Sequence, residues 1–294
     1  MTRRRITTLG AVLAATLMAT ALDSARAVRA QSQFAGTFAP IRTWAKPGET
    51  LARELRLQLV KSVTGQPLRF KAYAQDFWMS ADGRSTGYGD PGKVKASCSN
   101  WITVDPVTQE VAPGGDLLVR VSLTVPAGTQ PGGYWCAVSI DEQMDPRRKA
   151  LLGGSGMVLF ASFSNAVYVF VAPLQLDAKI KRLDIDSQNA SVTVQSLANS
   201  PLLIDGHLEF LREGVAEPVA KVDLARRVLL PEPHGSVMTE APLPPIEVLP
   251  DGEYLVKVVL DVGLDHLLGA QSKRSIKHAP AAPPGGAPPT PAKP

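Results

Sequence analysis

Short apolar runs alternate with turn signals along most of the chain, a pattern typical of β-sandwich domains. Between Phe34 and Pro173 seven such runs are separated by Gly- and Pro-rich turns. They predict strands at Thr37–Trp44, Leu51–Val60, Leu68–Phe77, Trp101–Val104, Leu117–Val125, Tyr134–Ile140 and along the apolar stretch that ends at Pro173. In the fifth run, odd-numbered apolar residues alternate with Arg120 and Ser122, as expected of a strand with one buried face.

The stretch Leu151–Pro173 is a Gly-rich loop followed by a long run rich in Val, Phe and Tyr. This composition predicts extended structure. Sandwich strands usually run about 5–6 residues, so a much longer strand that is apolar on both faces is hard to cover within one domain. We therefore predict that Met157, Leu159, Ala161 and Phe163, on the edge strand 157–163, contact a different polypeptide. A long central strand buried within its own domain is the alternative.

A second β pattern follows Pro173. It predicts strands at Ile180–Ile185, Ser191–Ser196, Gly206–Leu211, Ala220–Leu230, Gly235–Met238 and Tyr254–Val262. Neither half contains a helical pattern of convincing length. The predicted fold class is therefore all-β, with two immunoglobulin-like β-sandwich domains in tandem at residues 31–173 and 174–278. The Pro- and Ala-rich residues 279–294 cannot bury a core, which predicts a disordered tail.

The first 30 residues have the pattern of an export signal. Arg3-Arg4-Arg5 precede an apolar run from Ile6 to Leu22, and Ala25-Arg26-Ala27 is a small-residue cleavage pattern. The run is shorter than the roughly 20 residues that span a bilayer. We expect residues 1–30 to be a signal peptide that is removed, with the mature protein periplasmic and not inserted in a membrane. A twin-arginine signal is the alternative export route.

Charge excludes one class of partner. Residues 1–30 contain five of the 31 basic residues and one of the 27 acidic residues, so the rest of the chain has 26 of each. Nucleic acids and anionic lipids require concentrated positive charge. We therefore expect no nucleic-acid partner.

The chain has two cysteines, Cys98 and Cys136. An exported protein reaches an oxidising compartment, where a disulfide between them is the default expectation. Two buried free thiols are the alternative.

Four segments together resemble the periplasmic chaperones of chaperone–usher pilus systems, which have two immunoglobulin-like domains. Ala39–Glu49 is similar to their opening strand, with an arginine, a hydrophobic pair and a Pro-Gly turn. Trp101–Pro106 and Tyr134–Val138 resemble the run before their sixth strand and that strand itself, and Leu151–Pro173 resembles their seventh strand. A looser resemblance extends to the surface proteins that partner WxL proteins.

The resemblance implies a function in pilus or fimbria biogenesis. Members of that family lend alternate residues of the seventh strand to a secreted β-rich subunit, and an outer-membrane usher is a further implied partner. Arg42 falls where the family has an arginine that holds the subunit's terminal carboxylate, and Tyr168 falls where the family has a lysine. A phenol brings no charge, so the carboxylate anchor differs here. Lys71 and Lys61 are conceivable substitutes for that lysine.

The sequence contains no reactive constellation, so we expect no enzyme activity, no cofactor and no metal. Its four histidines have no metal-ligand spacing. The second hypothesis is a cell-envelope scaffold or binding module that recognises peptidoglycan or another glycan. It rests on the aromatic residues Trp44, Trp78, Trp101, Trp135 and Tyr88, most of which core packing explains equally well.

Overall fold

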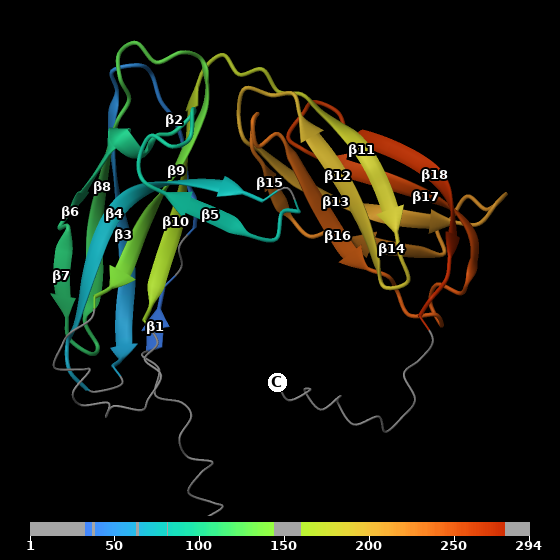
Figure 1. Ribbon diagram of the computed structural model, residues 1–294, viewed down its shortest axis with the longest axis horizontal. Helices are drawn as coiled ribbons and strands as arrows, with labels where there is room; N and C mark the ends of the chain where they lie inside the picture. Colours follow the sequence, from blue (N-terminus) through green and yellow to red (C-terminus); the bar gives the residue numbers. More distant parts are fainter. Residues whose placement is uncertain (1–32, 37–38, 63–64, 81, 144–159, 280–294) are drawn as a thin grey trace, which may run out of the picture.

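The computed structural model describes residues 33–36, 39–62, 65–80, 82–143 and 160–279. Figure 1 shows two groups of strands that lie at an angle and are joined by the segment after β10. The first group contains β1 (Gln33–Ala35), β2 (Ile41–Trp44), β3 (Thr50–Lys61), β4 (Leu68–Met79), β5 (Thr86–Gly89), β6 (Ile102–Asp105), β7 (Thr108–Val111), β8 (Asp116–Thr124), β9 (Gly132–Glu142) and β10 (Ser162–Val171).

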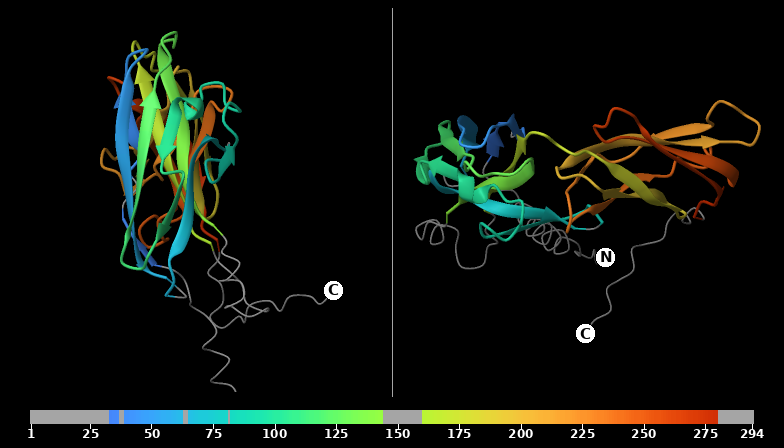
Figure 2. Two further views of the ribbon diagram at one scale, coloured as in Figure 1. Left: turned by 90° about the vertical axis from the view of Figure 1, so that its left-hand side faces the viewer. Right: turned by 90° about the horizontal axis from the view of Figure 1, so that it is seen from above.

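The second group contains β11 (Ala178–Ile185), β12 (Asn189–Ser196), β13 (Leu202–Leu211), β14 (Ala220–Asp223), β15 (Arg227–Leu229), β16 (Ser236–Pro242), β17 (Gly252–Asp261) and β18 (Leu268–Ile276). Seen from above, the two groups are separate bodies (Figure 2). Strands of one group pair only within that group across the described residues. The all-β prediction with two sandwiches is thus confirmed, whereas the domain limits at 173 and 174 stay a prediction.

The first sandwich consists of a four-stranded sheet, β1-β3-β8-β6, packed on a six-stranded sheet, β2-β10-β9-β4-β5, in which β7 also pairs with β4. Alternation explains how the two sheets share one core. In β8, Leu117, Val119, Val121 and Leu123 are buried while Arg120 is exposed. They pack against Val138 and Ile140 of β9 and the valines of β10. Burial of the odd-numbered residues of β8 is the predicted pattern.

Two contacts, one covalent and one polar, stabilise the first sandwich. Cys98 and Cys136 form a disulfide and are fully buried. The Tyr134 hydroxyl donates a hydrogen bond to the carbonyl of Gln130, four residues upstream, at 2.9 Å. This is the tyrosine corner of immunoglobulin-like folds. Tyr254 in the second sandwich makes the same bond to the carbonyl of Pro250 at 2.8 Å.

The second sandwich packs a three-stranded sheet, β11-β12-β16, on a five-stranded sheet, β14-β13-β17-β18, in which β15 pairs with β13. Several elements differ from the predicted ones. Ala220–Leu230 forms two short strands, β14 and β15, because Leu224–Arg226 leave the sheet between them. The edge strand β18 was not predicted because its half-buried and exposed positions alternate with few large apolar residues, and only Ile276 at its end is buried. In the first sandwich, β1, β5 and β7 were also missed.

Helical structure in the described part of the chain includes the single 3-10 turn Ser99–Trp101. No helix there is long and apolar enough to cross a membrane.

Candidate functional site

The outer edge of β10 is the most unusual feature of the first sandwich. Strand β9 pairs with all of β10, from Ser162 to Val171. On the other edge, β2 pairs in parallel with Val167–Phe170 only. Among the described residues, no strand continues this pairing along Ser164–Ala166. Half of a long strand therefore has an edge on which an incoming strand can pair.

The direction of the backbone N–H and C=O groups identifies which residues of β10 could hydrogen-bond to a partner strand at that edge. The amide of Ala45 donates to the carbonyl of Phe170 at 3.0 Å, so the main chain of Phe170 faces β2. In an antiparallel pair, successive residues direct their peptide groups to alternate edges. Ser164 and Ala166 therefore direct their backbone groups to the same edge as Phe170, whereas Asn165 pairs with β9. We call Ser164–Ala166 the open segment.

Two of the four residues predicted to contact another polypeptide, Ala161 and Phe163, lie within the described part of the chain. Met157 and Leu159 lie outside the described residues. Ala161 exchanges two hydrogen bonds with Glu142, one of them from the Ala161 amide to the Glu142 carboxylate at 3.0 Å. The ring of Phe163 packs edge-on against Phe34 at 5.0 Å between centroids. Both described members are thus held by the first sandwich, at the end of its core.

Arg42 and Tyr168 are brought together by the structure. They are direct neighbours in the parallel pairing of β2 with β10. The guanidinium of Arg42 lies over the Tyr168 ring, 5.5 Å from its centroid. Arg42 is exposed, and Tyr168 is only 4% exposed. Burial raises the pKa of Tyr168 to about 12, with a smaller opposing effect of Arg42. The phenol therefore stays protonated and able to donate a hydrogen bond throughout the neutral range.

The two lysines considered as substitutes lie elsewhere. Lys71 is on β4, where its ammonium lies 5.8 Å from the centroid of the Tyr73 ring, and its cross-strand neighbour is Asp141. Lys61 ends β3, in the opposite sheet. Neither lysine therefore supplies a second cation beside Arg42 and Tyr168.

A row of aromatic side chains continues from this pair across the sheet. Phe77 of β4 contacts Tyr168 edge-on, with centroids 6.2 Å apart, and the Trp135 indole donates to the Phe77 carbonyl at 3.0 Å. Tyr88 of β5 is the cross-strand neighbour of Phe77. Leu230 of the second sandwich is buried in the same hydrophobic cluster as Phe77, Trp135 and Tyr168. The aromatic row thus forms part of the contact between the two sandwiches.

The aromatic residues considered for a glycan platform do not share one surface. Trp135 is buried, Trp101 packs against Tyr134, and Trp78 stacks on His234 of the second sandwich with centroids 6.5 Å apart. Trp44 and Tyr88 are exposed, but they lie on opposite edge strands of the same sheet. Sequence alone could not separate these roles, because the burial of each ring depends on which strands and which sandwich lie against it.

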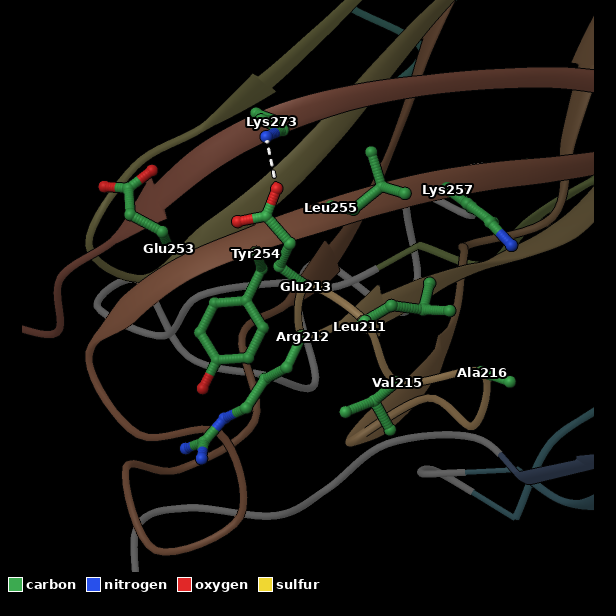
Figure 3. Close-up of a pocket in the computed structure, with 11 residues that line it drawn as sticks. Leu211, Arg212, Glu213, Val215, Ala216, Glu253, Tyr254, Leu255, Lys257 and Lys273 are labelled. Carbon is green, nitrogen blue, oxygen red and sulfur yellow. Dashed lines mark hydrogen bonds and ion pairs between the residues drawn. The ribbon is translucent and has the colours of Figure 1, made fainter.

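A second candidate is a groove of about 720 Å³ in the second sandwich, beside the turn that joins β13 to β14. Figure 3 shows Leu211, Val215 and Leu255 among its lining residues, together with the ion pair between Lys273 and Glu213. Sequence reasoning missed this groove because its walls come from a turn and three strands, β13, β17 and β18, that carry no motif. None of the residues predicted to bind a subunit lines it.

Within the described ranges, His, Cys, Asp and Glu side chains form no group of three or more that would hold a metal ion. The histidines are apart, each with its own neighbour: His207 with Glu209, His234 with Trp78, His266 with Asp265 and His278 with Asp251.

No protein-family model and no curated protein sequence match this chain. Solved structures do match it. The class 5 fimbriae chaperone CfaA aligns with a TM-score of 0.44 and 11% identity, over 82% of this chain and 99% of the chaperone. The Pseudomonas aeruginosa CupB2 chaperone aligns with a TM-score of 0.40 and 12% identity, over 81% and 97%. A chain from a chaperone–tip adhesin complex of CFA/I fimbriae biogenesis aligns with a TM-score of 0.44 and 12% identity, over 84% and 100%.

Proposed function

We propose that this protein is a non-enzymatic chaperone that binds and stabilises secreted β-rich subunits of a pilus or another surface structure by lending them the edge of β10. The observation that carries the proposal is the open segment, where β10 continues beyond its pairing with β2. Strand addition at an exposed edge is an established recognition mode in which main-chain hydrogen bonds supply general affinity.

Side chains would supply the register. The odd-numbered residues Val167, Val169 and Val171 face the core of the first sandwich. Because the side-chain period of a strand is two, Ala161 and Phe163 share this parity, and an extended chain before them would put Met157 and Leu159 on the same face. We propose that this series fills the groove of an incomplete subunit where the chaperone's own core ends.

Arg42 and Tyr168 would anchor the subunit. A guanidinium offers a forked and always-charged donor set for a carboxylate, and Arg42 is exposed beside the open segment. The neutral Tyr168 hydroxyl would add one hydrogen bond where the resembling family has a second cation. We further propose a periplasmic location after removal of residues 1–30, and an outer-membrane usher as the acceptor of the bound subunit.

One substitution separates strand addition from other modes of binding. Proline at position 164 removes an amide that faces the open edge, and the pairing of the neighbouring Asn165 with β9 is kept. We expect Ser164→Pro to abolish recovery of a β-rich secreted protein in a pull-down from periplasmic extract. Ser164→Ala, the matched control, removes only the hydroxyl that bonds Ser139 at 2.7 Å, and it should retain the subunit. Equal recovery by both variants would reject strand addition.

A glycan-binding module is the second candidate, and the exposure of Trp44, at 62%, is the observation that favours it. Sugars stack on exposed aromatic faces, so this function predicts that Trp44→Ala abolishes retention on insoluble peptidoglycan while Ser164→Pro leaves it unchanged. A chaperone predicts no retention by either variant or by the unmodified protein.

A further inference from the structure

Trp44 and Phe170 form an aromatic pair next to Arg42 and Tyr168, in which Trp44 is exposed and Phe170 is half-buried. The two residues are direct neighbours in the pairing of β2 with β10, one step along both strands from Arg42 and Tyr168 on the same face. Their ring centroids are 5.4 Å apart with the planes tilted by 44°. Trp44 is 62% exposed, as high as any large apolar residue in the described part of the chain.

The surroundings of this pair carry an uncompensated charge. In the described part of the chain, the geometry shows no ion pair for Arg42, and its aromatic contact is with the Tyr168 ring. The surface is continuous with the open segment, because Tyr168 and Phe170 follow Ser164–Ala166 on the same edge of β10. A cation, a neutral hydroxyl and an exposed indole thus lie on β2 and β10 next to the open segment, which is the part of the β10 edge that β2 leaves unpaired.

We propose that Trp44 and Phe170 recognise a flat apolar side chain on the residue whose free carboxylate Arg42 binds. This inference rests on the proposed function and deepens it, because it names the chemistry of the subunit's end: a carboxylate next to an aromatic ring. An aromatic ring that packs on Trp44 also reaches the edge of Phe170, whereas an aliphatic side chain lacks the stacking contribution. The pair of Arg42 with Tyr168 would then bind the carboxylate, and the neighbouring pair of Trp44 with Phe170 would bind the aromatic ring.

A protective role is the competing explanation for Trp44, in which its indole only covers Phe170. The two explanations differ in what Trp44→Ala changes. If Trp44 only covers Phe170, the substitution lowers the stability of the first sandwich and changes no preference among ligands. A recognition surface affects the ranking of ligands that differ only in the side chain beside the carboxylate.

The test uses N-acetyl-Ala-Phe, its C-terminal amide and N-acetyl-Ala-Ala as probes at millimolar concentration, with the full mature chain labelled with 15N. The indole N–H resonance of Trp44, assigned with Trp44→Phe, and the Nε–H resonance of Arg42 report binding. We expect N-acetyl-Ala-Phe to bind about tenfold more tightly than either other probe. N-acetyl-Ala-Ala lacks the stacking contact, and the amide lacks the charge-assisted hydrogen bond. Trp44→Ala should abolish the preference for Phe over Ala, and Arg42→Gln should abolish the preference for acid over amide.

Tyr88→Ala is the matched control, since Tyr88 is an exposed aromatic residue on the opposite edge of the same sheet. It should leave both preferences unchanged. Equal binding of the Phe and Ala probes, or a Phe preference that survives Trp44→Ala, would overturn the inference, as would the absence of any shift at Trp44. These outcomes are independent of the pull-down with Ser164→Pro, in which failure would instead reject strand addition itself.

Discussion

Arg84 of the first sandwich forms a two-bond ion pair with Glu240 of the second. Its Nε lies 3.1 Å and its Nη2 lies 2.5 Å from the two carboxylate oxygens. Arg84 belongs to the β4–β5 turn, which extends from the first sandwich toward β16 of the second (Figure 1). The turn and the aromatic row beneath Leu230 are thus two separate contacts that fix the angle between the sandwiches.

Removal of this ion pair should loosen the angle without unfolding either sandwich. Both side chains are partly exposed, and exposed ion pairs contribute little to stability in general. We expect Arg84→Met to broaden the distribution of shapes measured by small-angle X-ray scattering and to shift the thermal midpoint little. Arg226→Met is the control, because Arg226 pairs with Asp205 inside the second sandwich. An unchanged scattering profile for Arg84→Met would show that the remaining contacts between the sandwiches, among them the aromatic row and the stacking of Trp78 on His234, hold the angle without this ion pair.

Gly83, next to Arg84, permits the close approach of the turn. A Cβ atom at this position would lie 2.6 Å from the Met238 carbonyl oxygen and 2.7 Å from a Val237 methyl group. Its φ of +66° is also in the left-handed region that favours glycine. We expect Gly83→Ala to displace the turn from β16 and to raise hydrogen exchange at Arg84 and Ser85.

Gly48 supplies the control for Gly83, since it has a φ of +84° and nothing within 4 Å of its Cβ position. Gly48→Ala should therefore cost only the left-handed strain, roughly 1–2 kcal/mol, with no change in exchange at the β4–β5 turn. Equal exchange in the two variants would contradict the steric role of Gly83.

The alternation of apolar residues was sufficient to predict the fold class and most strands of the first sandwich, because a strand with one buried face has a period of two. The same rule failed for β5. Its sequence, Thr86-Gly87-Tyr88-Gly89, has two glycines that a strand interior disfavours. Gly87 is required there because a Cβ atom would lie 2.4 Å from the Trp78 ring.

The candidate site was predicted only in part. Arg42 and Tyr168 were found through the resemblance of Ala39–Glu49 and Leu151–Pro173 to one family, and the structure makes them neighbours. The open segment could not be located from sequence, because it depends on where β2 begins beside β10. The contacts of Arg84 and Trp78 with the second sandwich join residues more than 150 positions apart, and no local pattern indicates such pairs.

The disulfide should contribute measurably to the stability of the first sandwich. Cys98 and Cys136 are both fully buried, and cross-linking restricts the unfolded chain. We expect the double variant with Cys98→Ala and Cys136→Ala to lose about 2–4 kcal/mol of unfolding free energy. Urea unfolding followed by tryptophan fluorescence measures this, since Trp135 adjoins Cys136 in the chain. The reduced unmodified protein is the control and should match the variant, whereas a reductant-independent midpoint would contradict the expectation.

Alkaline pH should destabilise the first sandwich through Tyr168. The folded state holds the phenolic proton more tightly than the unfolded state, because burial raises the pKa from 10.0 to about 12. The resulting stability is complete below pH 10 and is lost as the pH rises from 10 through 12, which amounts to roughly 2 kcal/mol. Tyr73, whose pKa is also raised to about 12 by burial and by its hydrogen bond to Asp141, adds a second loss over the same range. Urea midpoints measured between pH 9 and pH 12 should therefore fall less steeply in Tyr168→Phe than in the unmodified protein, and absorbance at 295 nm should show one fewer late-titrating tyrosine. Parallel pH profiles would mean that Tyr168 ionises normally and that Arg42 and solvent, rather than burial, set its pKa.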